Sequence, residues 1–265
     1  MSKKIPKIIH YCWFGNKPLS DDAKKCIESW KKYCPDYEII EWNENNFDIN
    51  SNMYVREAYD AEKWAFVTDY VRLYALHNCG GVYMDTDVEL IAPIDKFLIH
   101  DAFSGFESSG KITTGIMSCR KGFNLFSEFI EYYNERHFLV DDGSYDLTTN
   151  VEIITNICRK YGFVENNKLQ NINGFALYSS DVFCPKNNST GVIHKTENTV
   201  AIHHFAGSWL DNDKIKLRNL RKKLCRKYGE NIGNILYKTI YVPYRFYVHV
   251  NTQGIKKTMR EVFNA

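Results

Sequence analysis

Paired cysteines, long apolar runs and a glycine-rich phosphate loop are all missing from this sequence. Its 8 cysteines are scattered without a CxxC pair, which disfavours a zinc ribbon or a disulfide framework and favours reduced thiols in a cytosolic protein. No apolar run of about 18 residues occurs, so no segment is expected to span a bilayer. The basic start, MSKKIPKIIHYCWF, is interrupted by Lys7 and His10 and lacks a small-residue cleavage site, so no secretion signal is expected.

Charge is divided unevenly along the chain. Residues 214–265 hold 13 Lys or Arg against 2 acidic residues, and residues 1–213 hold 21 against 30. The basic segment is also rich in aromatics (LYKTIYVPYRFYVHV), so it could contact anionic lipid head groups or nucleic acid. The alternative is a solvated helical appendage that packs on an acidic body.

The hydrophobic pattern predicts an α/β protein. A strand at 4–15, a helix at 20–33 and a strand at 36–44 form a β-α-β start, which is typical of a parallel sheet. A helix at 59–77 and a strand at 80–90 follow. Further helices are expected at 123–136 and 148–162, with short strands at 102–107, 113–122, 175–185 and 199–209 that belong in part to a second, more mixed sheet.

Two aspartates interrupt the strand expected at 80–90, GGVYMDTDVEL. On a strand, Asp85 and Asp87 share one face with Cα atoms roughly 6 to 7 Å apart. Carboxylates that close repel unless a cation lies between them, and hard oxygen ligands suit Mg²⁺ or Mn²⁺. The spacing does not follow the EF-hand pattern, which makes a structural calcium loop the weaker interpretation.

The helix before this strand carries a second polar pair. Asp69 and Arg72 are neighbours at i, i+3, on the side opposite the apolar stripe that holds Tyr70. One interpretation is an internal ion pair that joins the helix to the sheet. The other is a ligand site, in which Arg72 binds a phosphate or sugar oxygen and Asp69 accepts a sugar hydroxyl.

Three segments together resemble a known family. IPKIIHYCWFG, AFVTDYVRLYALHNCGGVYMDTDVEL and AIHHFAGSW are similar to the glycosyltransferase family 32 pattern with its DxD sugar-transferase region, as in capsular polysaccharide synthesis proteins and the clostridial glucosylating toxins. The resemblance covers about residues 4 to 210. It implies a GT-A type fold, that is, a Rossmann-like nucleotide-binding sheet with flanking helices and a smaller second sheet, and it implies retention of anomeric configuration.

The resemblance also assigns roles to individual residues. It implies that Trp13 packs on the nucleotide base, that Asp69 and Arg72 hold the transferred sugar, and that Asp85 contacts ribose or sugar and bridges towards the cation. Asp87 would coordinate the cation directly. The late metal ligand falls on His204, with its neighbour His203 as the other candidate, and the diphosphate contacts fall on Ser208 and Trp209. In the family, the helix on the acceptor side begins with the sequence Thr-Gly-Pro. In this chain Thr149 and Asn150, or their neighbours, stand where that Gly and Pro would be.

The hypothesis from the sequence is a retaining hexosyltransferase dependent on Mn²⁺ or Mg²⁺. It would move a sugar, expected from UDP-sugar, to a cell-surface glycan precursor such as a lipid-linked capsular, exopolysaccharide or O-antigen oligosaccharide. Residues 1–212 would form the catalytic domain and 213–265 a basic helical extension. We expect a cytoplasmic protein, with the inner face of the plasma membrane as a candidate location, and no nucleic-acid partner. The alternatives are a nucleotidyl- or phosphotransferase, disfavoured because WFGNKPLS offers Gly15 alone, and a non-catalytic glycan-binding module.

Overall fold

The structure, a computed structural model, describes residues 4–108, 110–207 and 212–253. The chain divides into two compact units. The first combines Met1–Lys186 with His194–Trp209, and the second combines Asn187–Ile193 with Leu210–Ala265. The domains 1–212 and 213–265 stay a prediction, since compactness alone does not show that either part folds or functions by itself.

The first unit begins with the predicted β-α-β element. Strand β1 (Ile8–Cys12), helix α1 (Asp21–Tyr33) and strand β2 (Glu38–Trp42) follow one another, and β1 pairs in parallel with β2. Helix α1 begins after Ser20, whose hydroxyl accepts a hydrogen bond from the backbone N–H of Ala23 at 3.2 Å. This cap satisfies one of the free N–H groups at the helix start.

The remaining elements of the first unit complete two sheets and their helical cover. In chain order they are η1 (Ile49–Ser51), α2 (Met53–Asp60), α3 (Trp64–Cys79), β3 (Gly81–Met84), β4 (Val88–Leu90), η2 (Asp95–Phe97), β5 (Ala102–Gly105), β6 (Ile116–Cys119), α4 (Asn124–Glu131), α5 (Asn150–Arg159), β7 (Gln170–Ile172), β8 (Phe175–Tyr178), α6 (Ser180–Phe183) and β9 (Ala201–His203).

The large sheet has seven strands in the order β2-β1-β3-β6-β5-β8-β7. The pairs of β1 with β2, β1 with β3 and β5 with β8 are parallel, while β6 and β7 run antiparallel to their neighbours. A second sheet pairs β4 with β9 in antiparallel register. The α/β class with a smaller second sheet, predicted from the sequence, is confirmed.

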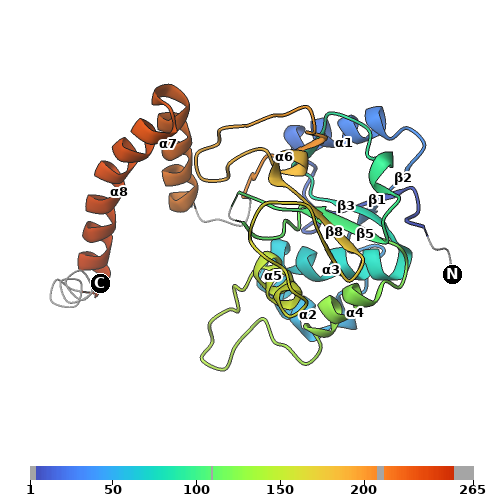
Figure 1. Cartoon of the computed structure of the whole chain (residues 1–265). Helices are drawn as coiled ribbons and strands as arrows, with labels where there is room; N and C mark the ends of the chain where they lie inside the picture. The colour runs from blue at the N-terminus through green and yellow to red at the C-terminus, as the bar shows by residue number, and fades with distance from the viewer. Residues whose placement is uncertain (1–3, 109, 208–211, 254–265) are drawn as a thin grey trace. The chain divides into compact units, whose positions relative to one another are not determined.

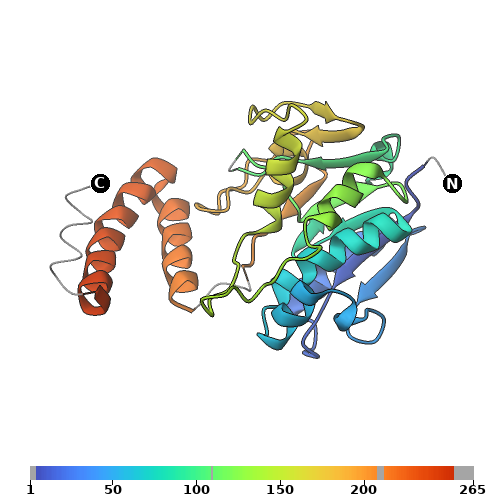
Figure 2. The same cartoon turned by 90° about the horizontal axis from the view of Figure 1, so that it is seen from below.

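Helices cover both faces of the large sheet, which makes three layers (Figures 1 and 2). Helices α2 to α5 pack on one face, in a core that includes Tyr83 and Phe126. Helices α1 and α6 and the small sheet pack on the other, in a core that includes Trp30 and Met84. Successive residues of β3 thus enter opposite cores, as the alternation of a strand buried on both faces requires.

Two predicted elements are divided in the structure. The predicted strand 80–90 is wrong as a single element, because β3 ends at Met84 and β4 begins at Val88 in the other sheet. Buried and paired on both sides, β3 leaves no room for ionised carboxylates, so Asp85 and Asp87 lie in the turn after it. The predicted helix 59–77 is also divided: α2 ends before Glu62, which has a φ of 55° in the left-handed region.

The second unit contains a helical hairpin of α7 (Asn212–Tyr228) and α8 (Glu230–Gln253). Gly229 turns the chain with a φ of 79°. Close packing continues at Gly233, where a Cβ atom would lie 2.5 Å from Cys225 Cα. The two helices are further linked by Arg221, which donates from Nε to Asn234 Oδ1 at 2.8 Å.

Candidate functional site

The aspartates lie in a short turn that connects the two sheets. The carbonyl of Asp85 accepts a hydrogen bond from the N–H of Val88 at 2.9 Å, and the N–H of Asp85 donates to the carbonyl of Gly115 at 2.8 Å. The turn leaves the side chains of Asp85 and Asp87 24% and 22% exposed. Both carboxylates are therefore mostly buried, with part of each side chain open to solvent.

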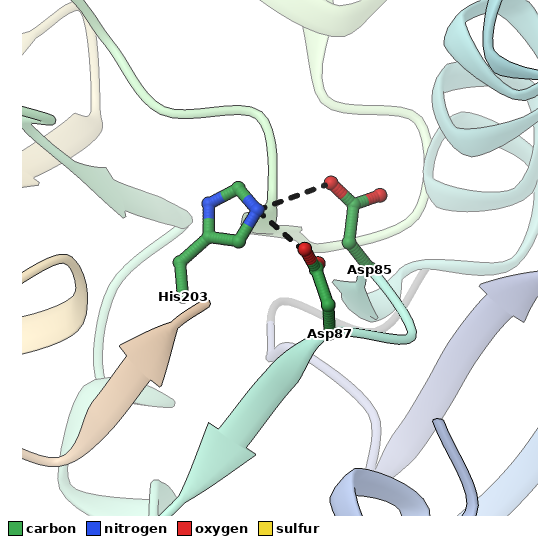
Figure 3. A group of neighbouring side chains, drawn as sticks. All are labelled: Asp85, Asp87 and His203. Carbon is green, nitrogen blue, oxygen red and sulfur yellow. Dashed lines mark ion pairs between the residues drawn. The ribbon is translucent and has the colours of Figure 1, made fainter. Parts of the chain in front are cut away.

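His203, the last residue of β9, brings an imidazole to the same place. Its strand partner is Val88, the residue directly after Asp87. His203 Nε2 lies 3.2 Å from Asp87 Oδ1 and 3.9 Å from Asp85 Oδ2 (Figure 3). One ligand atom from each of the three residues lies within 4.8 Å of the others.

The imidazole and the carboxylate strongly influence each other's protonation. Burial acts to lower the pKa of His203, but the negative charge of Asp87 outweighs it and raises that pKa well above its usual value. Burial acts to raise the pKa of Asp87. The positive charge and hydrogen bond of His203 and the N–H of Ala206 nevertheless hold that pKa below the usual range. In the absence of another cation, the proton on His203 thus balances the aspartate charge.

This donor set fits a divalent cation. Two carboxylates and one imidazole are common ligands of Mn²⁺, whereas Mg²⁺ prefers oxygen ligands throughout. A bound cation would take the place of the His203 proton as the positive charge between the two aspartates. The cluster therefore offers an oxygen- and nitrogen-containing cation site at the end of β3.

Arg72 and Asp69, on α3, lie beside this cluster. Arg72 Nη2 lies 3.1 Å from Asp69 Oδ1 and 3.3 Å from Asp85 Oδ1, and Nη1 donates to the carbonyl of Thr114 at 2.8 Å. The guanidinium also lies 4.8 Å from the ring centre of Tyr83. One arginine thus joins the helix, the aspartate turn and the loop before β6, so the predicted internal ion pair is present and extends into the candidate site.

The arginine remains charged although it is buried. Desolvation acts to lower the pKa of Arg72, but the neighbouring charge of Asp85, with further contributions from Tyr83 and Asp69, raises it. Burial raises the pKa of Asp69 to about 6, although Arg72 and the N–H of Asn150 oppose the rise. That N–H donates to Asp69 Oδ2 at 3.1 Å, which connects the start of α5 to the site.

The other residues predicted for the site are placed differently. Trp13 follows β1, and its indole N–H donates to the carbonyl of Lys17 at 2.5 Å. Because β1 and β3 are parallel neighbours, Trp13 and Asp85 lie at the same edge of the sheet. His204 is not in the cluster: its Nε2 lies 2.9 Å from Glu89 Oε2. Ser208 and Trp209 lie outside the described residues.

Sequence reasoning missed several contributors to this arrangement. Tyr83 donates from its hydroxyl to Asp85 Oδ1 at 2.8 Å, and Gly115 lies against the His203 ring. Because side chains alternate along a strand, His203 and His204 must point to opposite faces. The alternation does not show which of the two faces the aspartates. Nothing in the local sequence links Gly115 to a histidine far along the chain, since they meet only through the pairing of β3 with β6 and of β4 with β9.

Comparison with known proteins finds a family match over part of the chain. Residues 20–104 match the family model described as a glycosyltransferase sugar-binding region containing a DXD motif, and this segment includes Asp69, Arg72, Asp85 and Asp87. The resemblance predicted from the sequence is confirmed. The match covers about a third of the chain, and that third contains all four of these candidate site residues.

A curated relative is similar to part of the chain. Inositol phosphoceramide mannosyltransferase 3 of Schizosaccharomyces pombe is 30% identical over 128 residues, which make up 46% of this chain and 35% of the relative. The chain thus spans about a third of that relative's length.

Solved structures give more distant likenesses. The PaToxG glycosyltransferase has 16% identity and a TM-score of 0.45, covering 59% of this chain and 70% of its own. The galactosyltransferase LgtC, in complex with donor and acceptor sugar analogues, has 14% identity and a TM-score of 0.39, covering 88% and 95%. These TM-scores are too low to support an argument about function.

Proposed function

We propose that the protein is a metal-dependent, retaining glycosyltransferase that moves a sugar from a nucleotide-sugar donor to a cell-surface glycan precursor. The observation that carries the proposal is the contact of Arg72 with both Asp69 and Asp85, directly beside the group of Asp85, Asp87 and His203. A candidate cation site and a fixed guanidinium thus lie next to each other, at the edge of the sheet where a parallel α/β fold binds its ligands.

Each residue of the site has a task in this proposal. Asp85, Asp87 and His203 would hold Mn²⁺ or Mg²⁺, which as a Lewis acid neutralises the charge that develops on a departing diphosphate. Arg72 would place a second positive charge near the same oxygens, with its orientation fixed by Thr114 and Asp69. Asp69 would accept a hydrogen bond from a hydroxyl of the transferred sugar, which orients the anomeric carbon.

The proposed stereochemistry is retention. Positive charge develops at the anomeric carbon as the bond to the diphosphate breaks, and the cation and Arg72 stabilise the opposite charge on the leaving group. A front-side displacement then requires neither a carboxylate nucleophile nor a separate general base from the protein, and we assign none. The anomeric coupling constant of the transferred sugar in an NMR spectrum of the product distinguishes retention from inversion.

The donor and acceptor are proposed from the family. We propose UDP as the nucleotide, with Trp13, and Ser208 and Trp209 from outside the described residues, as donor contacts. Stacking on Trp13 alone would accept other bases. The fission yeast relative is named for mannosyl transfer and for an inositol phosphoceramide, which supports a lipid-linked acceptor such as a capsular, exopolysaccharide or O-antigen precursor. Such an acceptor would place the enzyme at the inner face of the plasma membrane.

A thermal-shift panel tests the donor site. UDP, GDP and a set of their sugar conjugates are added with Mn²⁺ and again with a chelator, to the wild type and to Asp87→Asn. A ligand at 100 times its Kd adds about 2.7 kcal/mol of stability, which corresponds to several degrees for a chain of this size. We expect a UDP shift that disappears with the chelator and in Asp87→Asn.

Asp22→Asn provides the control. Its side chain is 92% exposed at the start of α1, so the nucleotide shift should stay as in the wild type. A nucleotide shift that survives both the chelator and Asp87→Asn would contradict a metal-bridged donor site. A larger shift with GDP than with UDP would replace the proposed nucleotide while leaving the metal site intact.

A further inference from the structure

The imidazole of His203 has two nitrogens, and the candidate cation site uses one of them. Nε2 faces Asp85 and Asp87, whereas Nδ1 points away from both aspartates (Figure 3). Among the described residues, Nδ1 is buried and makes no hydrogen bond. A polar atom left unpaired in the protein interior is unfavourable and uncommon. The group that pairs with Nδ1 therefore decides how firmly the ring is held.

Cys184 lies in a segment that runs alongside β9. The carbonyl of Val182 accepts the N–H of Val200 at 2.8 Å, and Lys186 Nζ donates to the carbonyl of His204 at 2.8 Å. Cys184 stands midway between these two contacts along its own segment. The residue is thus placed next to the last residues of the strand.

The thiol of Cys184 is buried beside the imidazole of His203. Cys184 is 1% exposed. Burial acts to lower the pKa of His203, the charge and hydrogen bond of Asp87 raise it, and the thiol of Cys184 raises it further. Among the described residues, the ligand atoms that could hold a cation include no sulfur. The thiol therefore contacts the ring outside the cation side, where Nδ1 is.

The packing around the ring leaves its orientation to be chosen by a hydrogen bond. Phe205 stacks on the imidazole, and Gly115 lies against it. These contacts hold the plane of the ring. They do not distinguish the ring from one turned by 180° about the Cβ–Cγ bond, which would point Cε1 instead of Nε2 at the aspartates. An acceptor beside Nδ1 makes that distinction, because the turned ring would place a carbon there.

Coordination of a cation requires such an acceptor. A histidine that binds a cation through Nε2 is neutral and carries its proton on Nδ1, and metal-bound histidines almost always donate that proton to a second group. We propose that Cys184 is a positioning residue for the candidate cation site, whose sulfur accepts the Nδ1–H of His203 when a cation binds at Nε2. This inference rests on the proposed metal-dependent function. Since sulfur is a weak acceptor, its main effect is on the orientation of the ring.

Titration calorimetry with Mn²⁺ on the full chain tests the role of the sulfur. Cys184→Ala removes the acceptor and should lower Mn²⁺ affinity about tenfold, as is typical when the partner of a metal ligand is lost. Cys184→Ser keeps a group that can accept the Nδ1–H, so its affinity should stay within about threefold of the wild type. Because serine and alanine both lack the volume of sulfur, a rescue by serine separates the acceptor from packing.

Cys34 offers a matched control. It is also 1% exposed and also ends a helix, with φ and ψ of −133° and 57° against −129° and 53° for Cys184. Its charged neighbour Lys7 precedes β1, so Cys34 lies at the opposite edge of the sheet from the aspartate turn. Cys34→Ala should lose stability in urea unfolding as Cys184→Ala does, but it should bind Mn²⁺ as the wild type does.

Two results would overturn the proposal. Equal Mn²⁺ affinity in the wild type and Cys184→Ala would show that the sulfur does not support His203. An affinity that falls as far in Cys184→Ser as in Cys184→Ala would reduce the residue to a packing role. A wild type that does not bind Mn²⁺ at all would instead contradict the metal site that the proposed function requires, so the two failures are distinguishable.

Discussion

The ring of His203 lies against Gly115 so closely that a Cβ atom at residue 115 would come within 2.6 Å of His203 Cε1. Phe205 stacks on the same ring with centroids 4.0 Å apart. The carbonyl of Gly115 also accepts the N–H of Asp85. One glycine thus leaves space for the histidine and anchors the aspartate turn, although it offers no side chain to the site.

The first prediction concerns this glycine. Gly115→Ala should displace the His203 ring and lower the affinity for Mn²⁺ about tenfold or more, a loss typical of substitutions around a metal ligand. Titration calorimetry with Mn²⁺ measures the effect.

The control is Gly122→Ala, where no atom lies within 4 Å of the new Cβ but the φ of 68° is strained. It should cost about 1 kcal/mol of stability and leave Mn²⁺ affinity unchanged. Wild-type affinity in Gly115→Ala would refute the positioning role.

The two adjacent histidines give the second prediction. His203→Ala removes the imidazole from the aspartate cluster and should lower Mn²⁺ affinity by more than tenfold. His204→Ala removes the partner of Glu89 and should change that affinity by less than about threefold. The same calorimetric titration compares them, and the adjacent position makes each variant the control of the other. A larger loss in His204→Ala would restore the assignment made from the family resemblance.

Local sequence predicts part of this site and part of the fold. Helical periodicity places Asp69 beside Arg72, and the structure joins them. The β-α-β start follows from strand and cap signals that lie within about 40 residues. The single strand predicted at 80–90 is wrong. The hydrophobic pattern shows that these residues are apolar, but it does not show that the chain changes sheet between Met84 and Val88. His203 comes to Asp87 only through the pairing of β4 with β9, which no short-range signal encodes.

A third prediction concerns stability in mild acid. His10 is fully buried; its Nδ1 accepts the indole N–H of Trp42 at 3.1 Å, so Nε2 donates to the carbonyl of Gly80 at 2.8 Å. Burial lowers the pKa of His10 below 6.5, although the bond to Gly80 opposes this. Below pH 6.5 the unfolded chain binds a proton that the folded protein does not. The contribution of His10 to stability should therefore fall as pH falls, by up to about 1.4 kcal/mol per pH unit until the lowered pKa is reached.

Urea unfolding between pH 7.5 and 5.5 measures this slope. His10→Gln removes this titrating group, so the stability of the wild type minus that of His10→Gln should fall as pH falls, whatever the contribution of the other titrating groups. Parallel curves for wild type and His10→Gln would show that His10 does not contribute to acid sensitivity.

The last prediction separates a site tyrosine from a core tyrosine. Tyr83 and Tyr54 are 1% and 2% exposed, but only Tyr83 donates to a carboxylate, at 2.8 Å from Asp85. Among the described residues, the Tyr54 hydroxyl has no hydrogen-bond partner. A hydrogen bond to a charged group contributes about 1.5 to 3 kcal/mol, whereas a buried hydroxyl without a partner costs stability.

Tyr83→Phe keeps the ring beside Arg72 but frees the Asp85 carboxylate, so kcat/KM for sugar transfer should fall about tenfold or more. Tyr54→Phe should be neutral in transfer and neutral or stabilising in urea unfolding. Equal transfer rates in both variants would mean that Tyr83 acts by packing alone, and that Arg72 and the turn suffice to orient Asp85.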